Sequence, residues 1–143
     1  MRVEKQITIA APRDKVFAYV ADFKKHPEWA GHNLEVTLPD GPIAVGTTFS
    51  TLGHQLGKQN DTITVVELDP GRRIAFETKG KAGTVRHWFD VQEANGSTTL
   101  TKGMEFVKPS VASRISMPGI RLNVPRMLGK DLDKIKARLE TSA

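Results

Sequence analysis

Apolar residues near the C-terminal end recur at the spacing of one helical face. They are Leu128, Leu132, Ile135 and Leu139, at intervals of four, three and four positions. This pattern predicts a helix over Asn123–Thr141. An isolated helix of this length is only marginally stable in water, so its apolar stripe must pack against the rest of the chain.

Most of the chain before this helix alternates apolar and polar residues with the period of a β-strand. Val3–Ile9 is the first such segment, and Pro12 marks the start of a helix, because a proline at the first helical position loses no hydrogen bond. Asp22 ends this helix or caps a second short one, and Pro27 breaks the chain again. Further strands are predicted from residue 36 onward, chiefly over 47–52, 62–68, 73–78, 84–93 and 97–106, and the last two flank the hairpin signal Asn95-Gly96.

Prolines interrupt the segment that leads to the final helix. Pro109, Pro118 and Gly119 predict an irregular or partly helical connection over 107–123. Pro125 either starts the final helix or kinks a helix that begins near Ile120.

The strands are grouped apart from the helices, and this grouping indicates the α+β class. One helix cannot cover a flat sheet, so an antiparallel sheet of about six to seven strands must curve around the C-terminal helix, with one or two short helices after the first strand. With 143 residues, the chain has the size of a single domain over 1–143. A domain of this size buries enough surface to fold without a disulfide or a metal.

Composition narrows the possible chemistry. The chain has no cysteine, which excludes disulfides, zinc–thiolate sites and cysteine nucleophiles. The N-terminal segment mixes charges with apolar residues and resembles neither a signal peptide nor a membrane span, so we expect a cytoplasmic protein.

The positive charge is concentrated near the C-terminus. Residues 1–106 contain 13 basic and 13 acidic residues, whereas 107–143 contain eight basic and three acidic residues, which accounts for the whole net charge of +5. Either these cations form the solvated face of the helix, or they contact an anionic partner such as a phospholipid membrane, an acidic carrier protein or RNA.

Several segments of the chain resemble a known superfamily. They read VEKQITIAAPRDKVFAYVADFKKHPEW, PIAVGTTF, VVELDPGRRIAFET, GSTTLTKGMEF and DLDKIKARLE. Together they are similar to the START-like helix-grip (SRPBCC) superfamily, and most closely to its polyketide cyclase/dehydrase-like branch. The resemblance implies a curved antiparallel sheet wrapped around the C-terminal helix and enclosing an apolar cavity. Members include lipid carriers, hormone receptors, aromatases/cyclases and coenzyme Q-binding proteins, so the resemblance does not imply one activity.

Strand alternation predicts which side chains point toward the C-terminal helix. On each strand we place the more apolar alternate set inside. Met127, together with Met117 and Ile120, is expected near the mouth of the cavity, since methionine suits an adaptable lining. The predicted ligand-binding residues are Phe49, Phe76, His87, Phe89, Lys102, Met104, Met127, Leu128 and Leu132.

Two of these residues, His87 and Lys102, are polar on an otherwise apolar face. If their strands pair in register, the two lie nearly opposite each other. As candidate catalytic or binding groups, Lys102 would hold a carboxylate or enolate oxygen, and His87 would move a proton. Alternatively, Lys102 reaches water at the sheet end and His87 is a half-buried structural histidine.

Other polar residues have plainer interpretations. Asp131 and Asp133 lie among lysines and are expected to form surface ion pairs. His26 and His32 have a poor spacing for metal binding, and no metal or other cofactor is predicted. Trp29 is expected to pack in the core, and Trp88 to be partly exposed.

These observations leave three functions open. The leading one is binding or transport of a hydrophobic small molecule, such as a lipid, polyketide or quinone. The second is a polyketide aromatase/cyclase or dehydratase, supported by His87 and Lys102. The third is an interaction protein that uses its basic C-terminal segment. Sequence-specific nucleic-acid binding is disfavoured, because the chain lacks interleaved aromatic and basic residues. Gly129 inside the predicted helix leaves room for a bulky sheet residue or for a ligand.

Overall fold

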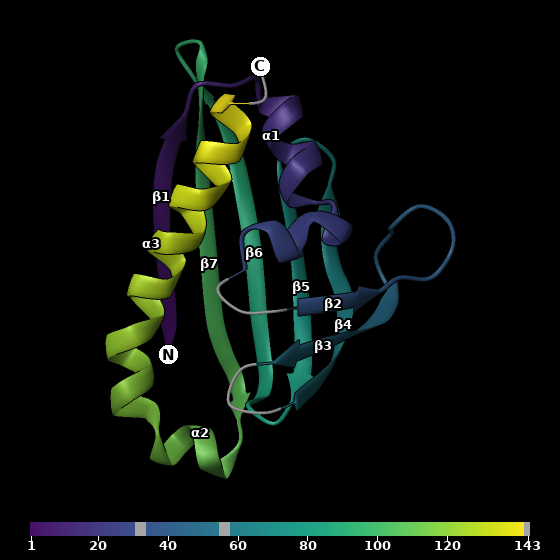
Figure 1. The fold of residues 1–143 in the computed structure, drawn as a ribbon, viewed down its shortest axis with the longest axis vertical. Coiled ribbons are helices and arrows are strands. Elements are labelled where there is room, and N and C mark those ends of the chain that lie inside the picture. Colours follow the sequence, from purple (N-terminus) through teal and green to yellow (C-terminus); the bar gives the residue numbers. More distant parts are fainter. Residues whose placement is uncertain (31–33, 55–57, 142–143) are drawn as a thin grey trace.

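The computed structural model describes residues 1–30, 34–54 and 58–141. Its centre is a seven-stranded antiparallel sheet in the order β1-β7-β6-β5-β4-β3-β2 (Figure 1). The strands are β1 (Arg2–Ile9), β2 (Leu34–Thr37), β3 (Thr48–His54), β4 (Lys58–Asp69), β5 (Arg73–Gly80), β6 (Gly83–Ala94) and β7 (Ser97–Pro109). The helices are α1 (Arg13–Val20), the 3-10 helix η1 (Phe23–Glu28), α2 (Val111–Ile115) and α3 (Met117–Thr141).

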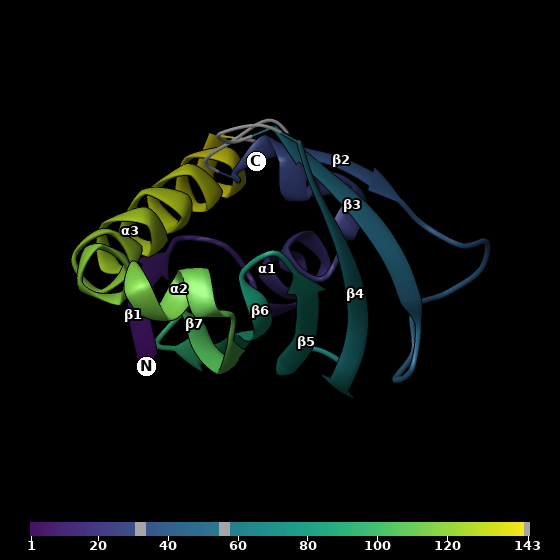
Figure 2. The ribbon, with the colours of Figure 1, turned by 90° about the horizontal axis from the view of Figure 1, so that it is seen from below.

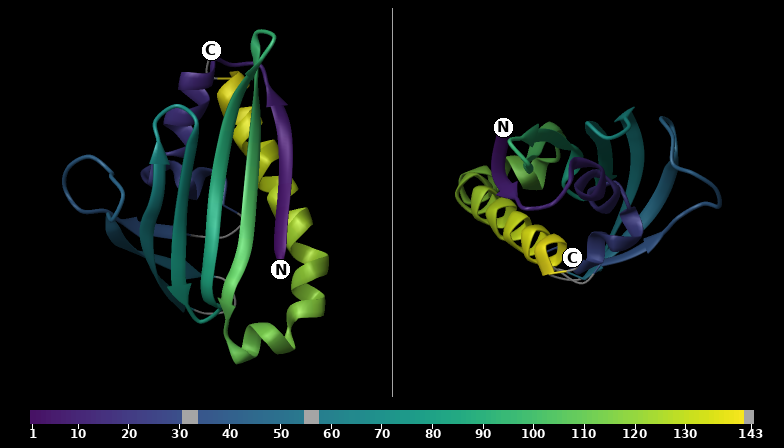
Figure 3. Two further views of the ribbon diagram at one scale, coloured as in Figure 1. Left: turned by 180° about the vertical axis from the view of Figure 1, so that it is seen from behind. Right: turned by 90° about the horizontal axis from the view of Figure 1, so that it is seen from above.

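The sheet curves, and all its covering helices lie on the concave side. Viewed from below, the strands form an arc, with α3 at one end of the arc and α1 beside its centre (Figure 2). From behind, none of the described helices lies on the convex face of the sheet (Figure 3). This arrangement confirms the predicted α+β helix-grip fold.

The C-terminal half of α3 is fastened to the end of β1. Lys136 Nζ donates a hydrogen bond to the Thr8 carbonyl oxygen at 2.6 Å, and the Ala10 amide donates to Glu140 Oε2 at 2.8 Å. Lys136 and Glu140 also pair with each other at 2.8 Å. The amide of Ala10 and then the Lys136 ammonium lower the pKa of Glu140. These bonds use backbone groups that a strand and a loop would otherwise leave to water.

The final helix starts earlier than Asn123, where we predicted it. Ser110 caps α2 by accepting a hydrogen bond from the Ser113 amide at 3.2 Å. The chain enters α3 at Met117, and Pro118 falls in the first turn, where an amide hydrogen has no helical partner. Pro125 therefore lies inside the helix rather than at its start.

The sequence signal for the β6–β7 hairpin is confirmed. Asn95 and Gly96 have φ values of 49° and 85°, which a two-residue hairpin turn of this kind requires. The strand predicted over 47–52 extends to His54 as β3.

Trp88 is buried on the convex face, although we predicted it to be partly exposed. Its indole lies across Gly103 on β7, and its Nε1 donates to Glu4 Oε2 at 2.8 Å. The Arg2 guanidinium sits 4.8 Å from the ring centre. A glycine on the neighbouring strand leaves a space that the indole fills, so only 2% of Trp88 is exposed.

The apolar core forms two separate clusters along α3. The larger cluster joins α1 and η1 to the sheet and to the C-terminal half of α3, and includes Phe23, Phe89 and Leu132. The second, here called the methionine cluster, consists of Val85, Met104, Phe106, Val124 and Leu128, with Met1, Val3, Met117, Ile120 and Met127 packed against it. All four methionines of the chain belong to this second cluster.

Candidate functional site

Polar side chains occupy the boundary between the two apolar clusters. They are His87, Lys102 and Asp131, here called the polar layer. Each of the three lies on its element between a residue of the methionine cluster and a residue of the larger cluster. The residues of the methionine cluster are Val85 on β6, Met104 on β7 and Leu128 on α3, and those of the larger cluster are Phe89, Leu100 and Leu132. The layer therefore crosses the interior from the sheet to the helix.

The centre of the layer is a buried ion pair. Lys102 Nζ lies 3.5 Å from Asp131 Oδ2, with 6% and 5% of the two side chains exposed. Burial lowers the pKa of Lys102, and the Asp131 carboxylate opposes this shift. Lys102 Nζ also lies 5.3 Å from the Trp29 ring centre. Of the two alternatives for Lys102, the one in which it reaches water is therefore wrong, and so is the prediction that Asp131 is a surface residue.

His87 belongs to the same layer but is offset from Lys102. In the β6–β7 register, His87 pairs with Met104, and Lys102 pairs with Phe89, so the two polar residues are diagonal neighbours rather than opposite. The His87 ring stacks on Phe76, with centroids 5.1 Å apart and planes 13° apart. Burial, the Lys102 charge and His26 lower the pKa of His87 to about 3. His87 is therefore neutral at pH 7.

His26 is a buried histidine, for which the sequence suggested only a poorly spaced metal ligand. It is 5% exposed, and its Nε2 donates to the Val20 carbonyl oxygen at 2.9 Å. Burial lowers its pKa to about 4, with a smaller contribution from Lys102. A signal was available, because Phe23, His26 and Trp29 recur every three residues, and this spacing places them on one face of a 3-10 helix.

Trp29 packs in the core as expected, and its polar atom is enclosed. The side chain is 5% exposed and meets Phe89 edge-on, with the ring centroids 5.6 Å apart. Its indole Nε1 is buried and has no hydrogen-bond partner among the described residues. His32, which we considered together with His26, lies outside the described residues.

The predicted ligand-binding residues lie in this interior. Phe49, Phe76, Phe89 and Leu132 belong to the larger cluster, and Met104, Met127 and Leu128 to the methionine cluster. Their role as ligand contacts stays a prediction. Asp131 completes the layer and was not predicted, because its sequence neighbours are charged.

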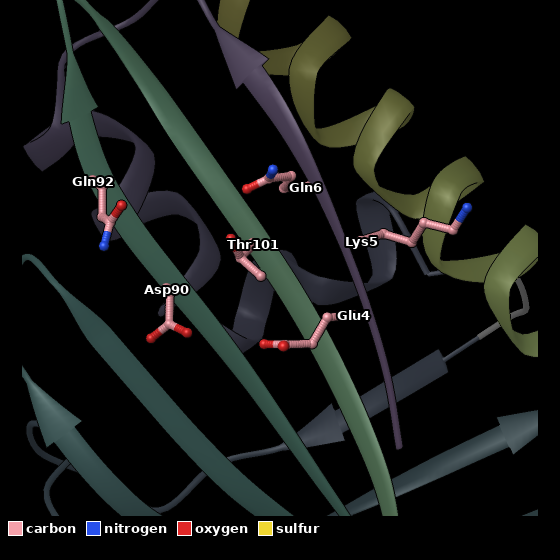
Figure 4. A pocket seen from close by; sticks show the side chains of 6 residues that line it. All are labelled: Glu4, Lys5, Gln6, Asp90, Gln92 and Thr101. Atoms are coloured by element: carbon pink, nitrogen blue, oxygen red, sulfur yellow. The ribbon is translucent and has the colours of Figure 1, made fainter. Parts of the chain in front are cut away.

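Open grooves lie elsewhere on the molecule. One of about 400 Å³ on the convex face is lined by Glu4, Lys5, Gln6, Asp90, Gln92 and Thr101 (Figure 4). Its carboxylates are already engaged, since Glu4 accepts from Trp88 and Asp90 from Arg73 at 2.8 Å. A second groove of about 500 Å³ runs between α1, η1 and the segment 38–47. None of the predicted ligand-binding residues lines either groove.

The described part of the chain contains neither a metal-binding group of side chains nor a membrane-spanning helix. Within 1–30, 34–54 and 58–141, no three His, Asp or Glu side chains gather in a way that suits a metal ion. In the same ranges, no helix has the length and apolar character needed to cross a membrane.

Comparison with solved structures places the fold among known proteins. Protein TTHA0849 from Thermus thermophilus has a TM-score of 0.78 at 14% identity, covering 100% of this chain and 99% of that one. Protein Ms6760 from Mycobacterium smegmatis has a TM-score of 0.76 at 14% identity, with coverage of 99% and 92%. The Polyketide_cyc-like protein Cgl2372 from Corynebacterium glutamicum has a TM-score of 0.69 at 23% identity, with coverage of 99% and 92%. At these identities the likeness shows the fold alone.

Sequence comparison identifies the family. No protein with a curated description matches this sequence. The family model described as "Polyketide cyclase / dehydrase and lipid transport" matches residues 1–140. The chain therefore belongs to the polyketide cyclase/dehydrase and lipid transport family.

Proposed function

We propose that the protein binds a hydrophobic small molecule between the sheet and α3. The observation that carries this proposal is the polar layer at the boundary of the two apolar clusters. Ligand sites usually combine an apolar lining with a few polar groups that fix orientation, and this interior has that composition. The family description, which includes lipid transport, supports the same function.

The polar layer is the proposed site of the ligand's head group. A lysine ammonium carries three donors, and the pair with Asp131 uses one of them. The remaining donors suit a carbonyl, carboxylate or phenol oxygen, and neutral His87 supplies one further donor or acceptor.

The methionine cluster is the proposed site of the apolar body. Methionine side chains are unbranched and polarizable, so they adapt to ligands of irregular shape. Met117 and Met127 are only partly buried, and both lie on α3, on the methionine-cluster side of Asp131. The apolar body would therefore lie among the methionines, with its head group at Lys102.

A cyclase or dehydratase is the second candidate function, because Lys102 and His87 would act on an enolisable carbonyl. General base catalysis is most effective when the pKa of the base lies near the working pH. His87, with a pKa of about 3, is a weak base at neutral pH. This weakness argues against His87 as the base.

The test compares ligands that share a chain and differ in head group. We would titrate dodecanoic acid and dodecanol against the protein, following displacement of 1-anilinonaphthalene-8-sulfonate fluorescence. The variant K102M/D131L removes the ion pair without leaving either charge buried alone, and such replacements are often neutral or stabilising. The variant E77Q/R86M removes a convex-face pair with a 2.7 Å contact and serves as the control.

We expect wild-type and control proteins to bind the acid equally well. K102M/D131L should bind the acid about tenfold more weakly, because a charge-assisted hydrogen bond is lost, and should bind dodecanol within about twofold of wild type. Equal acid binding by K102M/D131L would remove the head-group assignment. No binding of either ligand to the wild type would contradict the proposed function.

A further inference from the structure

Large apolar side chains are exposed together at one end of the molecule. Most of the large apolar residues that the described part leaves exposed lie between the end of β7 and the start of α3. They are Val107, Val111, Ile115 and Leu122, with exposed fractions of 41%, 73%, 77% and 60%. Single exposed apolar residues are common on protein surfaces, but several within one short segment mark an interaction site.

The same segment is purely cationic. From Val107 to Lys130 the sequence holds five basic residues and no acidic one. The basic residues are Lys108, Arg114, Arg121, Arg126 and Lys130, all of them exposed. Among the described residues none of them forms an ion pair, whereas Arg2, Arg73 and Arg86 on the convex face are paired with Glu4, Asp90 and Glu77. We call this segment, Val107–Lys130, the basic tip.

The basic tip includes one end of the molecule. In Figure 1, α2 and the first turns of α3 lie at the lower end of the molecule, below the sheet. The β5–β6 turn is tied to this end, because Ser113 Oγ donates to the Ala82 carbonyl oxygen at 3.0 Å. Lys79 beside this turn is also exposed, and Asp61 lies next to Gly80.

We propose that the basic tip docks on an anionic lipid surface. Cations attract acidic head groups, and neighbouring aliphatic side chains enter the boundary between head groups and acyl chains. RNA-binding surfaces use aromatic stacking, and the exposed apolar residues here are aliphatic. An acidic protein would match the charges, but neither of the two grooves described above is lined by residues of the tip.

The position of the basic tip links docking to the interior. Met117 and Ile120 lie within the tip and pack against the methionine cluster. Docking therefore brings this cluster next to the lipid, where a hydrophobic ligand could be exchanged. The docking inference does not require ligand binding, because the exposed cations and aliphatic side chains carry it alone.

Vesicle co-sedimentation tests the proposal. The probe vesicles are phosphatidylcholine alone and phosphatidylcholine with about 30% phosphatidylserine, at low and high salt. The variant R114Q/R121Q removes two tip charges, and I115S/L122S removes two exposed apolar side chains. The matched control, K134Q/R138Q, removes two exposed charges from the other end of α3. All of these side chains are exposed, and unchanged melting temperatures would confirm that each variant is folded.

We expect wild-type protein to bind only the anionic vesicles and to be released by high salt, because the Debye length shortens as salt rises. R114Q/R121Q should bind about tenfold or more weakly, while K134Q/R138Q stays within about twofold of wild type. I115S/L122S should weaken binding to the anionic vesicles at low salt, because the inserted aliphatic side chains are lost. The proposal is overturned if the wild-type protein does not bind anionic vesicles, or if K134Q/R138Q loses as much affinity as R114Q/R121Q. It is also overturned if single-stranded RNA or polyglutamate binds the protein more tightly than the anionic vesicles do at equal ionic strength. Dodecanoic acid titration without vesicles reports ligand binding separately.

Discussion

At the scale of single residues, Gly103 and Trp88 show how tightly the convex face is packed. A Cβ at Gly103 would lie 1.9 Å from Trp88 Cε2. The indole cannot move away without breaking its hydrogen bond to Glu4. We therefore expect Gly103→Ala to lower the free energy of unfolding by about 1–3 kcal/mol, measured by urea denaturation.

Gly129 supplies the matched control for this substitution. It lies inside α3, and apart from its own helical turn no atom is within 4 Å of the place where its Cβ would be. The glycine therefore makes no room for a bulky sheet residue, which was one of its two predicted roles. Gly129→Ala should raise the free energy of unfolding by up to about 1 kcal/mol, because alanine favours a helix. Equal effects of the two substitutions would contradict the packing account of Gly103.

Of the three residues in the polar layer, His87 and Lys102 could be placed from the sequence and Asp131 could not. Strand alternation correctly put His87 and Lys102 on the concave side, since that period is a local property. Asp131 looked like a surface residue because it stands between Lys130 and Lys134. Its burial depends on which face of α3 meets β7, and no local pattern contains that information.

At the scale of elements, α3 depends on its apolar stripe. Leu132 is 2% exposed and belongs to the larger cluster. Leu132→Ala should lower the free energy of unfolding by about 2–5 kcal/mol, because it removes buried apolar surface and leaves a cavity. Leu122→Ala is the control, with 60% of the side chain exposed, and should change the free energy by less than about 0.5 kcal/mol. A loss under about 1 kcal/mol for Leu132→Ala would mean that the stripe does not stabilise the fold.

The elements themselves could largely be predicted, and their limits less well. Long strands with clear alternation, such as β6 and β7, agree with the expected ranges. α3 starts at Met117, six residues before Asn123 and three before the alternative start near Ile120. The predicted starts came later because a proline such as Pro118 usually ends helices, yet it is tolerated in a first turn. The curvature of the sheet and its wrapping around α3 were expected from one covering helix and from the family resemblance, whereas the strand register came only from the structure.

At the scale of the whole molecule, buried His26 and partly buried His87 make folding sensitive to acid. The pKa of His26 is about 4 in the folded state, against 6.5 in the unfolded chain, and that of His87 is about 3. The unfolded state therefore binds more protons below pH 6.5, so the stability is complete above that pH and falls as the pH drops toward 4. Between pH 6.5 and 5, His26 alone should remove about 2 kcal/mol.

Urea denaturation at several pH values between 7.5 and 4.5 measures this loss. The variant H26F/H87F should show a flatter dependence of unfolding free energy on pH in the window from 6.5 to 5. Glu140, whose pKa is lowered by Ala10 and Lys136, titrates below that window and should affect both proteins equally. A variant with the wild-type slope would show that these histidines do not control acid unfolding.

The division of the core by the polar layer also bears on how such a protein diversifies. The bonds from α3 to the end of β1, and most of the buried aromatic rings, lie on the side of the larger cluster. The methionine cluster contributes fewer buried residues and adaptable side chains. Residues on the methionine side can therefore change, and with them the shape of the proposed ligand site, while the other side preserves the architecture. The fold therefore combines a methionine cluster in which side chains can vary with a larger cluster that maintains the architecture.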